Sequence, residues 1–179
     1  AVAKAGSELA ASVIEPVIER MPSKEWIERA RALADKAGAA LIFDEIKTGF
    51  RLATGGYQQF AGVTPDLAAF GKALANGHAL SAVCGREELM AAAEKTWISS
   101  TLASEAGALA AALAVMGWHA KLDVCGSLAK IGSEMRASVG RALKASGVQG
   151  VSVEGIDPMW FLRFAQPEDE TLFLTTAMQ

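Results

Sequence analysis

Residues 41 to 50 read LIFDEIKTGF: apolar side chains run directly into a pair of carboxylates, and a Thr-Gly turn follows. With Ala39 and Ala40 before it, the run is continuous rather than alternating, which is typical of a strand covered on both faces. Asp44 and Glu45 therefore stand at the carboxyl end of a predicted strand. Because open α/β sheets bind ligands at that end, the pattern predicts a ligand site beside these two residues.

The preceding segments predict that this strand belongs to a parallel sheet. A short strand, ASVIEPV, begins at Ala11, and Pro16 closes it because proline has no N–H to donate to a ladder. The next segment has Ser23 as a helix N-cap, apolar residues at helical spacing and Gly38 as a stop. Strand, helix and strand in this order form a right-handed crossover. We therefore expect an α/β fold, with a mainly parallel sheet and flanking helices.

Two more strands are predicted after a long loop. The loop covers residues 48 to 66 and carries several glycines, and a loop of that size is more often functional than idle. The third strand, LAAFGK, ends at Lys72, and a fourth begins near Leu80. Lys72 is thus predicted at the end of a strand.

The remaining third of the chain predicts a change of architecture. Residues 104 to 121 form a small-residue helix, and a second, amphipathic helix begins at Ser127. VQGVSVEG and PMWFLRF predict two strands of a smaller α+β unit, with the turn at residues 155 to 157. We expect residues 1–120 to be part of a large domain and residues 121–179 part of a small C-terminal domain.

Composition narrows the classes of function. The 179 residues are 51% hydrophobic, and 17 Lys and Arg against 20 Asp and Glu give a net charge of -3 without long single-sign runs. No basic face indicates nucleic acid or membrane as a partner, so we expect a small-molecule partner. Cys84 and Cys125 lack a CxxC pattern or a His at metal spacing, which predicts no metal site and favours a reducing, cytoplasmic compartment. The chain lacks an initial Met and ends on TLFLTTAMQ, so we expect a piece of a longer protein.

An apolar strand that ends in Asp-Glu is also typical of a magnesium-binding Walker B segment. The necessary P-loop is not found: Gly71-Lys72 is followed by Ala73, and Asp66 stands where the first glycine is required. The pair also follows the acidic strand instead of preceding it. The sequence therefore argues against a P-loop nucleotidase.

Asp44 and Lys72 together indicate another chemistry. A lysine at a strand end, among apolar residues, can act as an amine nucleophile and form a Schiff base. Pyridoxal phosphate needs such a lysine, and an acid that keeps its ring nitrogen protonated. At the ends of separate strands, Asp44 and Lys72 can approach one cofactor from two sides. The alternative is that Asp44 caps a loop and Lys72 is a solvated residue at a helix start.

Four ordered motifs, FDEIKTGFR, GVTPDLAAFGKALANG, AVCGREELM and SSTLASEAGALAAAL, extend over most of residues 11 to 118. They resemble the class III pyridoxal-phosphate aminotransferases, in particular the glutamate-1-semialdehyde aminomutase-like branch. The resemblance implies a type I pyridoxal-phosphate transferase fold, pyridoxal 5'-phosphate as cofactor and a homodimer with a shared active site. By the resemblance, Asp44 pairs with the pyridine nitrogen and Ile46 packs on one face of the ring. Lys72 carries the internal aldimine, and Thr101 reaches the cofactor phosphate from the neighbouring subunit.

The chain departs from the family pattern in two turns. Ala103-Ser104-Glu105 replaces a Gly-Asn-Pro-like turn, and Gly77-His78-Ala79 lacks the usual proline after glycine. Both departures concern substrate preference more than cofactor binding. The resemblance also implies that a glycine-serine phosphate loop and a ring-stacking aromatic precede residue 1, and that further substrate-domain residues follow residue 179.

Three further polar residues have open roles. Glu45 either orients the loop or cofactor site, or forms an ion pair with Lys47 or Arg51. His78 lies near Lys72 in sequence, but a general base there is unnecessary because the freed lysine can itself move the proton. Arg163, on a predicted strand of the small unit, is a candidate contact for a substrate carboxylate.

These observations predict a transaminase that moves an amino group between an amine or amino acid and a keto or aldehyde acceptor through a Lys72 Schiff base. A glutamate-1-semialdehyde-type 2,1-aminomutase is the alternative, in which the amine returns to the neighbouring carbon of the same molecule. A truncated, non-catalytic remnant of the scaffold and a plain α/β binding domain with coincidental motifs also remain open.

Overall fold

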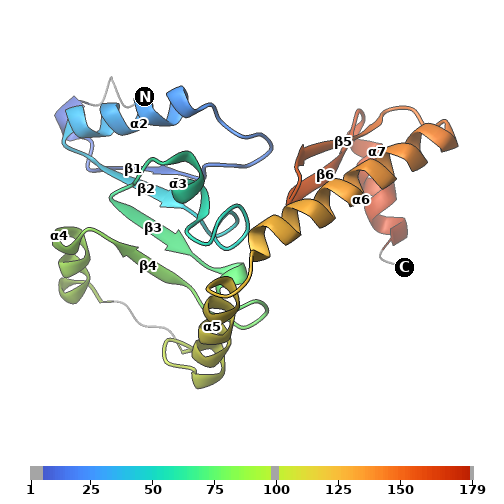
Figure 1. The fold of residues 1–179 in the computed structure, drawn as a ribbon. Helices are drawn as coiled ribbons and strands as arrows, with labels where there is room; N and C mark the ends of the chain where they lie inside the picture. The colour runs from blue at the N-terminus through green and yellow to red at the C-terminus, as the bar shows by residue number, and fades with distance from the viewer. Residues whose placement is uncertain (1–5, 98–100, 178–179) are drawn as a thin grey trace. The chain divides into compact units, whose positions relative to one another are not determined.

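The computed structural model describes residues 6–97 and 101–177, and the chain divides into two compact units (Figure 1). The first unit is Ala1–Cys125 and the second is Gly126–Gln179. The assignment of residues 1–120 and 121–179 to a cofactor domain and a small domain stays a prediction.

The first unit is built on a four-stranded sheet in the order β1 (Ala11–Ile14), β2 (Ala40–Asp44), β3 (Leu67–Phe70) and β4 (Ala82–Gly85). β1 and β2 pair in parallel, as do β2 and β3, whereas β4 runs antiparallel to β3. The mainly parallel sheet is as predicted. The reversal at β4 was not predicted, and it follows from the short connection after β3, which is too brief for a crossover between parallel strands.

The crossover between β1 and β2 is made by helix α2 (Lys24–Ala37), whose bounds match the sequence signals. Ser23 accepts the Trp26 N–H, which caps the first turn. Gly38 has φ 67°, and its N–H donates to the last turn, a left-handed C-terminal stop that glycine adopts without strain. One face of α2 is buried, through Ile27 and Ala34.

The long loop after β2 contains a short helix, α3 (Gly56–Ala61), that the sequence did not predict. Its own N-cap residue, Gly55, offers no side chain, so the local signal for a helix start is missing. Helix α4 (Glu87–Met90) and a 3-10 segment (Ala91–Lys95) after β4 were also not predicted. These elements are too short to show a periodic pattern, and α3 is held by hydrogen bonds to Glu45, more than ten residues before it.

The residues after β3 form a 3-10 turn, η2 (Lys72–Leu74), which packs against helix α5 (Ala106–His119). Phe50 from the long loop, Leu74, Ala75 and Ala112 form the buried centre of this contact. The partly buried residues around them are Phe70, Ala73, Leu80, Ala111 and Val115. This cluster fixes the segment that carries Lys72.

The second unit consists of most of helix α6 (Val124–Ser146), the hairpin β5 (Val151–Ile156) and β6 (Met159–Phe164), and helix α7 (Pro167–Ala177). β5 and β6 are antiparallel, and Ile156 pairs with Met159. The hairpin turn therefore lies at residues 157 and 158, not at 155 to 157 as predicted. Helix α7 was not predicted.

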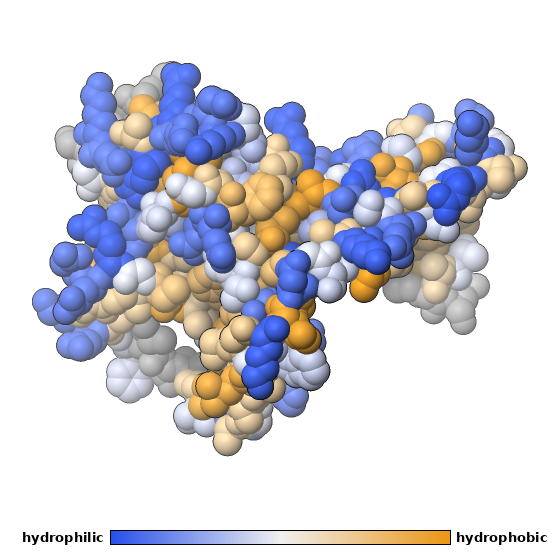
Figure 2. Space-filling model, in the orientation of Figure 1, coloured by the Kyte–Doolittle hydropathy of each residue, from blue (hydrophilic) through white to orange (hydrophobic). Residues whose placement is uncertain are grey.

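Apolar side chains are exposed on α5, and Figure 2 shows orange atoms over this helix. Leu109, Leu113 and Met116 are among its exposed residues. Within the described part of the chain, no single helix is both long and apolar enough to cross a membrane. Helices α5 and α6 reach that length and composition only when they are counted together, with a bend at the break between them.

Candidate active site

The ends of β2 and β3 bring the two predicted site residues to one edge of the sheet. Asp44 ends β2, and its register partner in β3 is Ala69. The Glu45 N–H donates to the Ala69 carbonyl at 2.9 Å, so the pairing continues one residue beyond the strand. Lys72 begins η2 two residues after β3 ends. Because parallel strands end at the same edge, Asp44 and Lys72 stand at the edge where open α/β sheets bind ligands.

Asp44 is half-buried and has one free carboxylate oxygen. Its Oδ1 accepts the Ile46 N–H at 3.0 Å, which closes the turn after the strand. Among the described residues its Oδ2 has no hydrogen-bond or ion-pair partner. The free oxygen can accept a hydrogen bond from a protonated ring nitrogen.

Lys72 has a left-handed backbone, with φ 43°. A residue with a Cβ pays roughly 1–2 kcal/mol in that conformation, so the packing around η2 must hold it there. The Lys72 side chain is exposed, and its amine has no partner among the described residues. Apolar surroundings were expected for the side chain of Lys72. They are found instead around the residues of η2 that follow it.

Ile46 lies against the residue that precedes this lysine. A Cβ atom at the buried Gly71 would lie 3.5 Å from Ile46 Cγ2 and 3.6 Å from Cγ1. The apolar side chain of Ile46 therefore adjoins Gly71, at the edge shared by Asp44 and Lys72. Three of the four predicted site residues are brought together in this way.

Thr101, the fourth, is exposed in the turn before α5, and no contact joins it to the other three. The SST motif extends into residues 98–100, which lie outside the described part. The contact of Thr101 with the cofactor phosphate of a neighbouring subunit stays a prediction.

The turn that departs from the family pattern has a structural use. Glu105 is the N-cap of α5, and its carboxylate accepts the N–H groups of Gly107 at 2.8 Å and Ala108 at 2.6 Å. These two backbone hydrogen bonds, with a smaller contribution from the nearby His78, lower the pKa of Glu105. His78 itself is exposed in the turn after η2. In the part of the chain that the structure describes, no contact supports a role for His78 in proton transfer.

Glu45 is fully buried and anchors the long loop. Its carboxylate accepts hydrogen bonds from the Thr48 hydroxyl and from the Tyr57 and Gln58 N–H groups, both at 2.8 Å. The last two are first-turn amides of α3, so Glu45 supplies the cap that Gly55 lacks.

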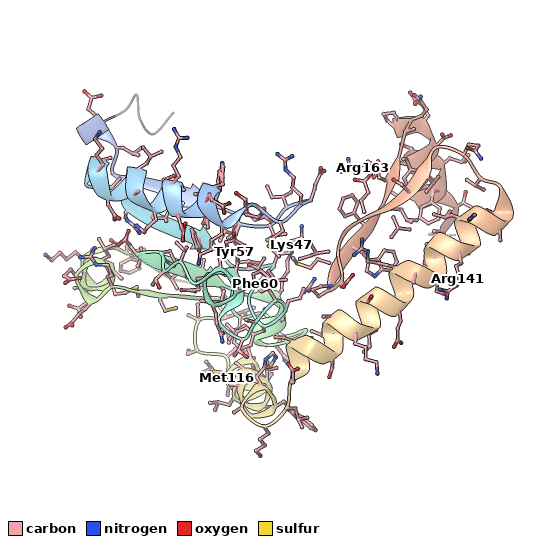
Figure 3. All side chains as sticks on the ribbon, turned by 45° about the horizontal axis from the view of Figure 1, so that its top comes forward. Lys47, Tyr57, Phe60, Met116, Arg141 and Arg163 are labelled. Atoms are coloured by element: carbon pink, nitrogen blue, oxygen red, sulfur yellow. The ribbon has the colours of Figure 1, made fainter. Side chains whose placement is uncertain are left out.

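The ion pair considered for Glu45 is wrong: among the described residues Glu45 forms no salt bridge with Lys47 or Arg51, and Lys47 bonds elsewhere. Lys47 Nζ lies 3.8 Å from Glu15 Oε1 and donates to the Ile18 carbonyl at 3.2 Å. Lys47 is labelled in Figure 3, and its charged end is directed to the loop after β1. Glu45 therefore orients the loop, the other of its two predicted roles.

Arg163 is engaged within its own hairpin. Its Nε lies 3.3 Å from Glu154 Oε2 across β5 and β6, and its guanidinium lies 5.1 Å from the centre of the Phe161 ring. Its predicted contact with a substrate carboxylate stays a prediction.

A buried carboxylate at the opposite end of β3, Asp66, was missed by sequence reasoning. It accepts hydrogen bonds from the Leu41 N–H at 2.7 Å, from Arg31 at 2.7 Å and from Arg86 at 3.1 Å. Burial raises the pKa of Asp66, but these hydrogen bonds and the Arg31 charge outweigh it and lower the pKa overall. The hydrogen-bond partners of Asp66 are far away in sequence, so no local sequence pattern predicts them. Among the described residues, no group of three or more His, Cys, Asp or Glu is arranged to hold a metal ion.

Comparison with known families assigns the chain to one of them. Residues 1–174 match the family described as aminotransferase class-III, and the chain belongs to this family. The resemblance seen in the four motifs is thereby confirmed.

Curated relatives include both kinds of activity predicted from the motifs. A 3-aminobutyryl-CoA aminotransferase of Cloacimonas acidaminovorans (strain Evry) is 37% identical over 83% of this chain and 36% of its own length. A glutamate-1-semialdehyde 2,1-aminomutase of Syntrophobacter fumaroxidans is 39% identical over 80% of this chain and 35% of its own length. The chain thus spans little more than a third of the length of these relatives.

Solved structures support the fold. The FumI protein of Sphingopyxis sp. MTA144, in its PLP internal aldimine form, matches 91% of this chain and 41% of its own chain with a TM-score of 0.82 and 25% identity. An omega-transaminase from Sphaerobacter thermophilus matches 92% of this chain and 39% of its own, with a TM-score of 0.76 and 28% identity. The predicted type I pyridoxal-phosphate fold is confirmed.

Proposed function

We propose that this chain is part of a pyridoxal-phosphate-dependent transaminase that moves an amino group between an amine or amino acid and a keto or aldehyde acceptor. One observation carries the proposal: a carboxylate oxygen and an amine that have no partner among the described residues share the ligand-binding edge of the sheet with an apolar side chain. These are Asp44, Lys72 and Ile46. Family membership over residues 1–174 supports the same chemistry.

The residues present fit the cofactor. The Lys72 amine is accessible to bond covalently with an aldehyde, and Asp44 Oδ2 is available for a ring N–H. Ile46 offers an apolar side chain against which a flat aromatic ring can pack. When bound, pyridoxal phosphate supplies an electron sink that stabilises negative charge at the substrate's alpha carbon.

Each residue then has a distinct task. Asp44 holds a proton on the ring nitrogen, and an anionic carboxylate is suited to this because it stabilises the positive charge there. Lys72 would hold the cofactor through its amine and, when free of that bond, would remove and return the substrate proton as a general base and acid. Thr101 of a neighbouring copy donates to the cofactor phosphate. The protein is therefore proposed to be a homodimer that shares its active sites.

A cytoplasmic location is proposed with this function. Cys84 and Cys125 are both free thiols, which agrees with a reducing compartment. Small amines and keto compounds are the proposed partners, and neither nucleic acid nor membrane enters the proposed reaction.

An aminomutase is the second candidate, supported by the 39% identity to a glutamate-1-semialdehyde 2,1-aminomutase. Product analysis separates the two reactions. A transaminase consumes a separate amino acceptor, whereas an aminomutase converts one substrate into its isomer without an acceptor.

The deciding experiment is mass spectrometry of the purified protein before and after borohydride treatment with pyridoxal phosphate. The proposal expects one reduced cofactor adduct, mapped by peptide digestion to Lys72, and its loss in Lys72→Ala. The intact mass also shows whether the working protein is longer than 179 residues. If the purified protein is longer than this and forms no adduct, the proposal that it is an enzyme is overturned. If it has this length and forms no adduct, the non-catalytic remnant is favoured.

A further inference from the structure

We propose that Glu45 is a positioning residue for this site: its buried carboxylate holds the loop that seats Ile46 beside Gly71 and Phe50 on the segment of Lys72. The inference rests on the proposed function, because it concerns how Lys72 is presented to pyridoxal phosphate. Glu45 itself touches neither the cofactor nor the substrate.

Glu45 lies between Asp44 and Ile46 in sequence, but its side chain bonds to Thr48, Tyr57 and Gln58 and not to the residues around Lys72. It is completely buried and caps α3, as described above. A Cβ atom at Gly56, where φ is 78°, would lie only 2.6 Å from Glu45 Cδ. The helix start and the carboxylate are therefore fitted closely together.

This anchor joins two parts of the loop. Thr48, fully buried, donates its hydroxyl to Glu45 at the beginning of the loop, while Tyr57 and Gln58 donate their N–H groups from its middle, in α3. Between them, the Arg51 N–H donates to the Thr48 carbonyl at 3.2 Å. One buried carboxylate thus joins two segments separated by almost ten residues. Without it, several buried N–H and O–H groups lose their acceptor.

The beginning of the loop, at Phe50, packs on the segment that carries Lys72. Phe50 is buried with φ 59°, a conformation that only well-packed surroundings hold for a bulky residue. Its ring meets Phe70 edge to face, with 6.1 Å between ring centres, and it shares the buried cluster with Leu74 and Ala75. Lys72 lies between these contacts in sequence.

Lys72 is therefore held from both sides by the segment that Glu45 anchors. Ile46, the residue after Glu45, adjoins Gly71, and Phe50 packs on the residues that follow Lys72. The strained backbone of Lys72 needs such support, because its side chain has no partner of its own among the described residues. Release of the loop removes this support from the backbone that carries the amine.

Glu45→Gln tests this with little change of shape. The carboxylate accepts with both oxygens: Oε2 receives the Thr48 hydroxyl and the Tyr57 N–H, and Oε1 receives the Gln58 N–H. A glutamine has one acceptor oxygen, so its NH2 group must face at least one donor. The cap or the Thr48 contact is then lost, while the side-chain volume is kept.

Asp66→Asn is the matched control, because Asp66 is also a buried carboxylate with several donors but lies at the opposite end of β3. Glu28→Gln, at an exposed carboxylate of α2, controls for the substitution itself. The measurements are the dissociation constant of pyridoxal phosphate from absorbance titration and the fraction of Lys72 trapped by borohydride. Both are made on purified protein at a temperature where urea curves show every variant to be folded.

We expect Glu45→Gln to raise the dissociation constant on the order of 10-fold and to lower trapping at Lys72, as loss of a supporting hydrogen-bonded group does elsewhere. Asp66→Asn lowers stability but leaves both values within about 2-fold of the unsubstituted protein, because its network does not reach the site. Equal effects of Glu45→Gln and Asp66→Asn overturn the positioning role, as does normal binding by folded Glu45→Gln. If the unsubstituted protein itself gives no adduct at Lys72, the proposed function fails and takes this inference with it.

Discussion

The side chain of Ile46 lies against Gly71, and Gly71 directly precedes Lys72. A Cβ atom at residue 71 would meet Ile46 at 3.5 Å, an ordinary van der Waals distance. The backbone of Gly71 is extended, with φ -168° and ψ -152°. Neither the conformation nor the space therefore demands glycine at this position, but the space left is small.

This contact predicts different results for two substitutions. Gly71→Ala keeps the free energy of unfolding within about 1 kcal/mol of the original and leaves cofactor binding nearly unchanged. Gly71→Val overfills the site and displaces Ile46, which raises the pyridoxal-phosphate dissociation constant about 10-fold, or about 1.4 kcal/mol. Absorbance titration and urea unfolding measure both effects. Tight binding by Gly71→Val would show that Ile46 does not contact the ring.

The left-handed backbone of Lys72 predicts a difference between two variants that both remove the amine. Lys72→Gly relieves the strain at φ 43°, whereas Lys72→Ala retains it. We expect Lys72→Gly to be more stable than Lys72→Ala by about 1 kcal/mol in urea unfolding, although glycine usually lowers stability. Neither variant forms an adduct with pyridoxal phosphate. Greater stability of Lys72→Ala would contradict the left-handed conformation.

Asp44→Asn is expected to separate cofactor binding from catalysis. The amide oxygen can still accept the Ile46 N–H, so the turn after β2 is kept. A neutral amide does not stabilise a protonated ring nitrogen, so amino transfer slows by about 100-fold or more while trapping at Lys72 continues. Turnover with the best amine from a donor screen, together with peptide mapping, tests both parts. Unchanged turnover assigns Asp44 the loop-capping role instead.

Asp66 predicts a pH-dependent contribution to stability. Its pKa is lowered in the folded protein, because hydrogen bonds from the Leu41 N–H, Arg31 and Arg86 outweigh the effect of burial. The contribution is present above the unfolded pKa of about 3.9 and is lost as the pH falls through the folded pKa. Asp66→Asn should cost about 3 kcal/mol at pH 7, because it breaks a buried ion pair.

The cost of Asp66→Asn should shrink as the pH falls through the lowered pKa of folded Asp66, because the natural aspartate then becomes protonated as well. Urea unfolding of both proteins across this range gives the difference in free energy directly. A cost that is the same at low and neutral pH would mean that the charge of Asp66 contributes nothing.

Sequence patterns were sufficient wherever a structural element carries its own signals. Helix α2 has a capping serine and a terminal glycine, and the run before Asp44 has the continuous apolar pattern of a buried parallel strand. Asp44 and Lys72 were found because each follows such a strand. Their common position at one edge is a direct result of parallel pairing.

Helix α3 and two left-handed backbones depend on contacts between residues far apart in sequence, and sequence reasoning missed them for that reason. Helix α3 has no capping side chain nearby and is completed by Glu45. The left-handed backbones of Phe50 and Lys72 are held by packing between the loop, η2 and α5. The intrinsic backbone preference of phenylalanine or lysine does not favour this left-handed conformation.

A last prediction concerns two glycines of helix α6 that differ in their surroundings. Gly132 is buried against the hairpin turn, and a Cβ atom there would lie 2.5 Å from the Asp157 carbonyl carbon and 3.2 Å from Pro158 N. Arg136, one turn further along, donates to Asp157 Oδ1 at 2.6 Å and holds the same turn. Gly140 is exposed, and a Cβ atom there would meet nothing within 4 Å.

Gly140→Ala should therefore stabilise the second unit by about 1 kcal/mol, because alanine is the better helix former. Gly132→Ala has the same gain in helix preference but must push the turn away from α6, for a net loss of about 2 kcal/mol. Hydrogen exchange of the β5 and β6 amides reports the stability of this unit in the whole protein. Slower exchange in Gly140→Ala and faster exchange in Gly132→Ala are expected. Equal behaviour of the two variants would mean that α6 does not pack closely on the hairpin turn, since helix preference alone cannot distinguish the two positions.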